Sequence, residues 1–246
     1  VSWLKGGLLL ADVLHTVSPR YAQEILTPEA GQGLDALLRL RRDALVGVLN
    51  GLDFDEWDPA TNEHLPAPFG LDDLSGKERC KRALQAELGL KADLRPPLVG
   101  FVGRMAHQKG VDLLVEAAPN LLDKGAQLVV LGSGDAGLER RVRELVEAFP
   151  RRAAAFIGYD RAVTHRVLAG CDLVVMPSRF EPCGLTQMQA MRYGTVPVAH
   201  AVGGLVDTIT PVSARALARN RATGFLFRTP SARALSLALG RALKLY

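Results

Sequence analysis

Short apolar runs alternate with longer amphipathic stretches from residue 96 to the end of the chain. The runs are rich in Val, Leu and Ile and contain no polar alternation, which is typical of strands buried on both faces of a sheet. Strands that alternate with helices pair in parallel, and each right-handed crossover places its helix on a face of that sheet. The pattern therefore predicts an α/β fold with a doubly wound, Rossmann-like parallel sheet.

The ends of each periodic stretch give the expected boundaries. Strands are expected at residues 98–102, 128–131, 154–157, 173–176, 196–199 and 225–227. Helices are expected at residues 111–122, 138–149, 162–169, 185–193 and 232–243. The loops that follow the strands then gather at one edge of the sheet, where proteins of this class bind their ligands.

The chain before residue 96 has a different pattern. A strand is expected at residues 12–17, and Ser18-Pro19 begins a helix with Pro at its first position. A second strand at residues 45–49 runs into a turn signal. After a proline-rich segment, a helix is expected at residues 77–88 and ends at Gly89.

These differences divide the chain into three parts. We predict residues 1–50 to be the tail of an incomplete amino-terminal α/β domain and residues 51–95 to be an interdomain linker with a wrapping helix. Residues 96–246 are predicted to form the Rossmann-like domain. The chain begins at Val1 and stops at Tyr246 inside a helical pattern, so we expect a fragment with truncated carboxyl-terminal helices.

Composition narrows the class of protein. The 246 residues carry a formal net charge of +4 without a Lys/Arg block, which favours solvated helix faces over a nucleic-acid site. Cys80, Cys171 and Cys183 are widely spaced and contain no C-x-x-C pair, so a reducing cytoplasm is expected rather than a disulfide framework. No apolar stretch reaches the roughly 18 residues that cross a bilayer.

Two cations follow the first strand of the predicted sheet. Arg104 and Lys109 lie in a loop between Gly103 and Gly110, which opens the next helix. A diphosphate requires positive charge and backbone N–H donors; Arg supplies a planar fork and Lys a compact point charge. The loop is a candidate phosphate site, although the same residues could be surface cations that cap a loop.

A carboxylate occupies the corresponding loop after strand 173–176. Glu181 precedes Pro182-Cys183-Gly184 at a helix start. It could bind sugar hydroxyls or stabilise positive charge at an anomeric carbon, or it could interact only with the helix dipole. Cys183 is expected to pack in the turn, because no His lies near it in the sequence to activate a thiolate. A cationic loop and a Glu loop on one sheet predict a site for a phosphorylated, sugar-like substrate.

Residues after other strands could also take part. Gly203-Gly204 opens a helix, where it could bind phosphate or form a tight turn. Tyr159 could stack on a nucleobase or pack at a rim. Gly132-Ser133-Gly134-Asp135 is only half of a dinucleotide fingerprint, because no acidic residue ends the next strand. Asp53-Phe54-Asp55 has the D-x-D spelling of metal-dependent sugar transferases but does not follow a core strand, so no metal site is expected.

Together the motifs resemble the ADP-glucose-dependent bacterial glycogen synthases and plant starch synthases, which are retaining glycosyltransferases with the two-domain GT-B fold. The string Glu-Pro-Cys-Gly-Leu-Thr-Gln beside Tyr-Gly-Thr is specific to this group, whereas the Gly-Arg…Lys-Gly loop is shared by most GT-B transferases. The matching stretches lie in the expected order at residues 11–25, 47–57, 103–110, 177–187 and 193–208.

The resemblance implies a role for each candidate residue. Arg104 and Lys109 would bind the distal phosphate of ADP-glucose and stabilise the departing ADP, while Glu181 would face the glucose. Tyr159 would stack on adenine, and Asn50, at the domain hinge, would reach the sugar from the other side. The backbone at two helix starts would contact sugar hydroxyls or phosphate, through Cys183, Gly184, Leu185, Gly203 and Gly204. No metal or other cofactor is implied, and an α-glucan would be the acceptor.

Two features leave other functions open. Gln189 stands where many retaining GT-B enzymes have a second Glu, and the acceptor-side catalytic residues are expected upstream of Val1. The alternatives are a retaining GT-B transferase with a different nucleotide sugar and a non-catalytic nucleotide-binding module; a dinucleotide dehydrogenase fits least. As a fragment, the chain is expected to bind the donor at best. The expected location is cytoplasmic, or plastidic for a plant protein, with no nucleic-acid or membrane partner, and the oligomeric state is left open.

Overall fold

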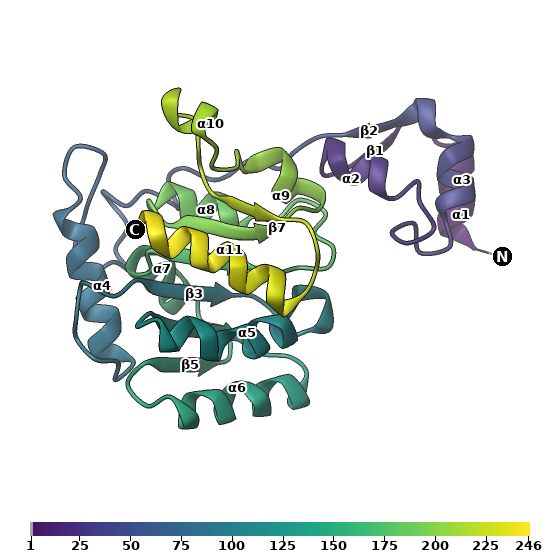
Figure 1. Cartoon of the computed structure of the whole chain (residues 1–246). Helices are drawn as coiled ribbons and strands as arrows, with labels where there is room; N and C mark the ends of the chain where they lie inside the picture. Colours follow the sequence, from purple (N-terminus) through teal and green to yellow (C-terminus); the bar gives the residue numbers. More distant parts are fainter. Residues whose placement is uncertain (1) are drawn as a thin grey trace.

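The computed structural model describes residues 2–246 and has the predicted α/β architecture (Figure 1). Six parallel strands form the main sheet in the order β5-β4-β3-β6-β7-β8. Each strand lies within one residue of its predicted ends. The strands are β3 (Leu98–Val102), β4 (Gln127–Gly132), β5 (Ala153–Ile157), β6 (Leu173–Met176), β7 (Val196–His200) and β8 (Phe225–Phe227).

Helices cover both faces of this sheet. One face carries α5 (Val111–Asp123), α6 (Ala136–Ala148) and α11 (Ala232–Leu245). The other face carries α4 (Ser75–Glu87), α7 (Arg161–Gly170) and α8 (Thr186–Arg192). The short helices α9 (Gly203–Thr208) and α10 (Ala214–Ala218) follow β7. All five predicted helices are present, and α10 is an addition that the periodicity did not reveal.

Successive strand residues enter different hydrophobic clusters. Val99 and Phe101 of β3 pack in the cluster that contains α5 and α11, whereas Leu98 packs in the cluster that contains α4 and α7. Leu128 and Val129 of β4 divide in the same way. Because side chains alternate across a strand, an apolar residue is needed at nearly every position, which explains the continuous apolar runs.

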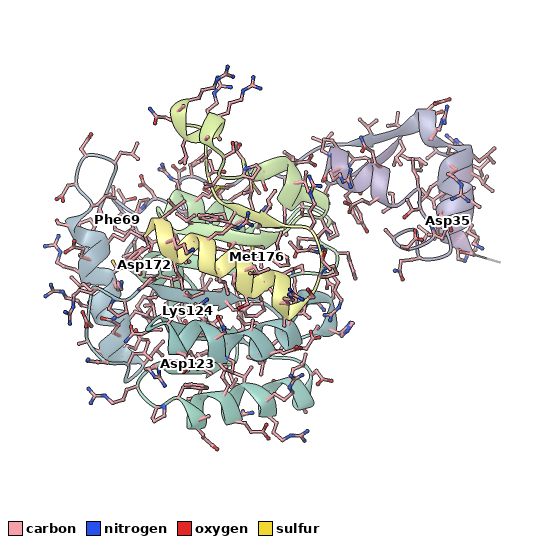
Figure 2. The ribbon with its side chains drawn as sticks, viewed as in Figure 1. Asp35, Phe69, Asp123, Lys124, Asp172 and Met176 are labelled. Carbon is pink, nitrogen blue, oxygen red and sulfur yellow. The ribbon has the colours of Figure 1, made fainter. Side chains whose placement is uncertain are left out.

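The sheet has a topological switch point beside β3. This strand pairs with β4 on one side and with β6 on the other, so the connections that leave β3 and β6 run in opposite directions along the sheet. Asp172, directly before β6, and Met176, its last residue, are labelled in Figure 2 and show that the carboxyl end of β6 faces the amino-terminal segment. Ligands of open α/β sheets bind at such a point, outside the carboxyl ends of the strands.

The amino-terminal segment forms a small unit of its own beside this edge (Figure 1). Its parallel strands β1 (Leu14–Thr16) and β2 (Leu45–Gly47) pair only with each other among the described residues and are shorter than predicted. The helix predicted at Ser18-Pro19 is α2 (Pro19–Glu24), and the Ser18 hydroxyl caps it by accepting from the Tyr21 N–H at 2.9 Å.

Two further helices of this segment were not predicted. They are α1 (Trp3–Leu10), which contains two glycines that lower helix propensity, and α3 (Asp35–Leu40), which a 3₁₀ turn at Arg42–Ala44 follows. No helix in the described part of the chain is long and apolar enough to cross a membrane.

Helices α2 and α9 join the two units by capping each other. Asp207 of α9 accepts from the Ser18 hydroxyl at 2.6 Å and from the Arg20 N–H at 2.9 Å, at the start of α2. Glu24 of α2 accepts from the Gly203 N–H, at 3.0 and 3.1 Å, at the start of α9. Each carboxylate lies at the positive end of the other helix, so both contacts stabilise the docking of α2 on α9.

The wrapping segment packs on the main domain through a buried aromatic cluster. Trp57 stacks on His165 of α7 with 4.1 Å between ring centroids. The Asn62 amide donates to His165 Nδ1 at 3.2 Å and to the Tyr193 hydroxyl at 3.1 Å. A donor on Nδ1 makes this nitrogen the acceptor and leaves the ring proton on Nε2. Burial lowers the pKa of His165 to about 4.

We predict that this cluster makes stability depend on pH. Because the pKa of His165 is about 4 in the folded chain and about 6.5 when unfolded, the contribution of neutral His165 is complete above pH 6.5 and is lost as the pH falls toward 4. The free energy of unfolding should fall by about 3 kcal/mol from this residue over that range. Urea unfolding at several pH values measures the effect.

The control is His165→Phe, which keeps a ring against Trp57 and removes the titration. This variant should be less stable at pH 7, where the bond to Tyr193 is lost, and should have a shallower pH profile between 6.5 and 4. Parallel profiles for the two proteins would contradict the assignment.

Candidate functional site

The loops after β3 and β6 meet at the switch point. Lys109 lies in the short 3₁₀ turn His107–Lys109 before α5, and Glu181 lies in the loop before α8. The Lys109 ammonium donates to Glu181 Oε2 at 2.6 Å, and the Ser178 hydroxyl donates to the same oxygen at 3.0 Å. Residues 72 positions apart in the chain thus share one ion pair, in which the Glu181 side chain is only 7% exposed.

A second set of contacts fixes the two loops to each other. Arg179 forms two parallel bonds to Asp112, at 2.7 and 2.8 Å, and its backbone N–H donates to the Gln108 carbonyl at 2.8 Å. The Gln108 amide donates to the Phe180 carbonyl at 3.0 Å. Hydrogen bonds from the Arg179 guanidinium lower the pKa of Asp112. Bidentate pairs of this kind hold a fixed geometry, so the Lys109 and Glu181 side chains lie on a rigid base.

Arg104 lies in the same network but is exposed. Its guanidinium donates to the Gln108 side-chain oxygen at 3.1 Å, and the amide of Gln108 bridges to the Glu181 loop as described. In the described residues, Arg104 has no carboxylate partner. A neutral amide therefore orients the guanidinium and leaves its charge available to an anion.

A cavity of about 340 Å³ opens beside Arg104. Its walls come from the ends of β3, β4 and β5, from the starts of α7 and α8, and from the wrapping segment. Tyr159, which is 82% exposed, and Leu185 line it. A cavity of this size with mainly apolar walls and a few charged side chains is typical of a small-molecule site.

Several residues around this cavity were not identified from the sequence. The wrapping segment was predicted only as a linker, and the Gly132-Ser133 turn was rejected as half of a dinucleotide motif. Position in a strand–helix loop could have identified Ser133, whereas residues of the wrap reach the cavity only through tertiary packing. The additional lining residues are Glu56, Trp57, Gly132, Ser133, Arg161, Thr164, Thr186 and Gln189.

The three residues at the start of α8 have different environments. Cys183 is 3% exposed, which fits the packing role expected for it. Gly184 has a φ of +70°, and Leu185 is partly exposed at the cavity. Their backbone N–H groups have no hydrogen-bond acceptor within residues 2–246. They remain predicted ligands of sugar hydroxyls or phosphate.

Gly203, Gly204 and Asn50 remain predictions with different surroundings. A Cβ on Gly203 would lie 1.9 Å from the Glu181 carbonyl, and one on Gly204 would lie 2.1 Å from the Cys183 carbonyl. The pair therefore lets α9 approach the Glu181 loop, and the Gly203 N–H is occupied by Glu24. Asn50 is exposed and makes no hydrogen bond with either loop in the described chain.

The described residues contain no cluster of three or more His, Cys, Asp or Glu side chains that could hold a metal ion. Asp53, the first residue of the D-x-D spelling, accepts from the N–H groups of Asp55 and Glu56 at 3.0 and 3.1 Å. The carboxylate thus closes a local turn.

Comparison with known protein families shows which family this chain belongs to. The profile described as glycosyl transferases group 1 matches residues 88–246, and that described as the starch synthase catalytic domain matches residues 1–40. The chain belongs to the group 1 glycosyltransferases. Its resemblance to glycogen and starch synthases is thereby confirmed, and the two matched regions fall on the main domain and on the amino-terminal segment.

Individual relatives extend the match over the whole chain. The glycogen synthase of Thioalkalivibrio sulfidiphilus is 53% identical over 247 residues, which cover 100% of this chain and 51% of the relative. That of Cellvibrio japonicus is 50% identical over 100% of this chain and 51% of its own length. The chain therefore spans about half the length of the curated relatives that it matches.

A solved structure agrees with these relatives. The catalytic domain of starch synthase IV from Arabidopsis thaliana, bound to ADP and acarbose, superposes with a TM-score of 0.93 at 40% identity, covering 99% of this chain and 50% of that one. A glycosyltransferase from Rickettsia africae, at 19% identity and a TM-score of 0.67, shares the fold and covers 99% of this chain and 55% of its own. The α/β fold assignment is confirmed.

The ion pair yields a prediction about stability. Lys109→Met leaves the Glu181 carboxylate without its counter-ion in a largely buried position, which should cost about 2 kcal/mol of unfolding free energy, less than for a fully buried pair because Lys109 is 22% exposed. The double variant Lys109→Met/Glu181→Gln removes both charges and should recover more than half of this loss. Urea unfolding measures these variants together with the single variant Glu181→Gln. If the effects of the two single substitutions add up to that of the double variant, the pair contributes nothing to folding.

Proposed function

We propose that the intact protein transfers glucose from ADP-glucose to the non-reducing end of an α-1,4-glucan with retention of configuration, and that this chain carries the donor site. The observation that supports it most directly is the Lys109–Glu181 pair near a cavity of about 340 Å³ that Arg104 and Tyr159 line. Glycogen synthases that match the whole chain, and a starch synthase structure bound to ADP, support this choice of reaction and donor.

The chemistry of the reaction matches the distribution of charge. Breaking the glycosidic bond to ADP leaves growing negative charge on the phosphate and oxocarbenium-like positive charge on the sugar. Arg104 and Lys109 stabilise the first charge, and Glu181 stabilises the second. A nucleotide sugar bound between Lys109 and Glu181 separates the pair. Lys109 then binds the negative phosphate in place of Glu181, and Glu181 faces the electron-poor sugar in place of Lys109.

The nucleoside occupies the cavity in this proposal. The exposed ring of Tyr159 covers the adenine, and the N–H groups of Gly184 and Leu185 reach the sugar hydroxyls or the phosphate. Cations and backbone donors supply the required charge, so the proposed reaction uses no metal. The three cysteines, all buried thiols in the described chain, fit a proposed cytoplasmic location.

We predict that the 246-residue chain binds ADP. Arg104 is exposed and its only described side-chain partner is Gln108, so Arg104→Ala should leave the unfolding midpoint unchanged and weaken ADP binding by about tenfold, the worth of one charge-assisted contact. The matched control is Arg140→Ala, which removes another exposed guanidinium, from α6. Titration calorimetry gives the dissociation constants; a chain that folds but does not bind ADP would contradict the donor site.

A second prediction concerns the intact protein. With a glycogen primer it should use ADP-glucose in preference to UDP-glucose, and Glu181→Gln should lower kcat by about 10² while changing donor affinity less. Initial rates at varied donor concentration separate the two effects. Exclusive use of UDP-glucose would replace ADP-glucose as the proposed donor, and unchanged turnover in Glu181→Gln would remove the role of the carboxylate.

A further inference from the structure

Gln187, in the first turn of α8, is a fully buried polar residue whose side chain contacts the loop before this helix. Its side-chain nitrogen donates to the Cys183 carbonyl at 3.0 Å and to the Gly184 carbonyl at 2.9 Å. The same nitrogen donates to the Thr208 hydroxyl of α9 at 3.0 Å, so three acceptors share its two hydrogens. One amide group therefore gathers two consecutive carbonyls of the loop and links them to a neighbouring helix.

Because the peptide bond is planar, these contacts also set the direction in which the next N–H groups point. In a trans peptide the N–H points opposite to the preceding C=O, so turning the Cys183 and Gly184 carbonyls inward turns the N–H groups of Gly184 and Leu185 outward. Gly184 is left-handed at φ +70° and Leu185 is right-handed at φ −110° and ψ −33°. Successive residues of opposite hand form a concave group of N–H donors that suits an anion.

Thr208 extends the same arrangement to α9. Its hydroxyl donates to the Gly204 carbonyl at 2.6 Å and so presents its lone pairs to the Gln187 amide. The Gly204 N–H donates to the Glu181 carbonyl at 3.1 Å. Helix α9 therefore holds the Glu181 end of the loop directly and its Cys183-Gly184 end through Gln187.

The fit between Gln187 and Gly184 is close. A Cβ on Gly184 would lie 2.4 Å from the Gln187 side-chain oxygen, so the amide occupies the space that a side chain at position 184 would fill. That oxygen is buried and has no hydrogen-bond donor within residues 2–246. A buried acceptor without a partner normally destabilises a protein, so packing alone does not explain the choice of Gln.

We infer that Gln187, with Thr208 as its support, is a positioning residue that aims the Gly184 and Leu185 N–H groups at the donor. The inference rests on the proposed function and adds to it a residue that does not touch the substrate. The NH2 group of the Gln187 amide performs this role by binding the loop carbonyls. The amide oxygen has no partner within residues 2–246 and is present because every amide side chain carries both groups.

The first test compares two buried glutamines. Gln187→Leu removes the bonds to the loop, and Gln85→Leu removes equivalent bonds from a residue of α4 that is also 0% exposed and binds Asp93 and Gln127 instead. Both variants should lose stability. Only Gln187→Leu should weaken ADP binding, by about tenfold, since two charge-assisted contacts are misaimed. Titration calorimetry on the 246-residue chain measures this.

Two further variants separate hydrogen bonding from shape. Gln187→Glu has nearly the same volume but sets an acceptor against two carbonyls, so it should bind ADP no better than Gln187→Leu. Thr208→Val should weaken binding by about threefold, and Thr208→Ser, which keeps the hydroxyl, should restore it. In the intact protein, Gln187→Leu should also lower kcat, whereas Gln85→Leu should not.

Hydrogen exchange distinguishes a failure of this inference from a failure of the proposed function. Without nucleotide, Gln187→Leu should increase exchange in residues 181–192, and Gln85→Leu should not. If the unaltered chain fails to bind ADP but this exchange pattern holds, the donor site is wrong and the loop-holding role stands. If the unaltered chain binds ADP and Gln187→Leu or Gln187→Glu binds it equally well, the positioning role is overturned.

Discussion

The contact between Lys109 and Glu181 is the interaction on which the site depends. A cation after β3 and a carboxylate after β6 approach within 2.6 Å because these strands are neighbours at the switch point. Both charges are partly withdrawn from water, and each would be costly there without the other. In the proposed function a nucleotide sugar offers the same pair of partners, a phosphate and an electron-poor sugar, so the pairing holds the site ready for a substrate with that polarity.

The rest of the fold keeps this pair in place and builds a cleft beside it. Arg179 and Asp112 fasten the two loops together, and the wrapping segment contributes Glu56 and Trp57 to the cavity lining. Helix α9 has contacts in two directions, because it caps α2 of the amino-terminal segment through Asp207 and binds the Glu181 loop through Gly204. One short helix, α9, therefore takes part both in docking the amino-terminal segment and in holding the shape of the Glu181 loop.

Much of this arrangement could be predicted from the sequence. The apolar runs identified β3 and β6 to the residue, and the rule that ligands bind beyond strand ends selected Arg104, Lys109 and Glu181. The pairing of Lys109 with Glu181 could not be derived, because it depends on strand order, which hydrophobic periodicity does not determine. The same applies to His165 and the wrapping segment, whose partners lie many residues away. Gln187 bonds to nearby Cys183 and Gly184, but only through a loop conformation that periodicity does not reveal. Helix α1 was missed because its two glycines lower the helix propensity of a segment that buries none of its residues.

A crystal structure of the chain with ADP tests the central claim most directly. The account predicts phosphate oxygens within hydrogen-bonding distance of the Arg104 guanidinium and the Lys109 ammonium, adenine against the Tyr159 ring, and a Glu181 carboxylate that is no longer bonded to Lys109. Nucleotide bound elsewhere on the sheet, or bound in the cavity with its phosphates away from both cations, would contradict it.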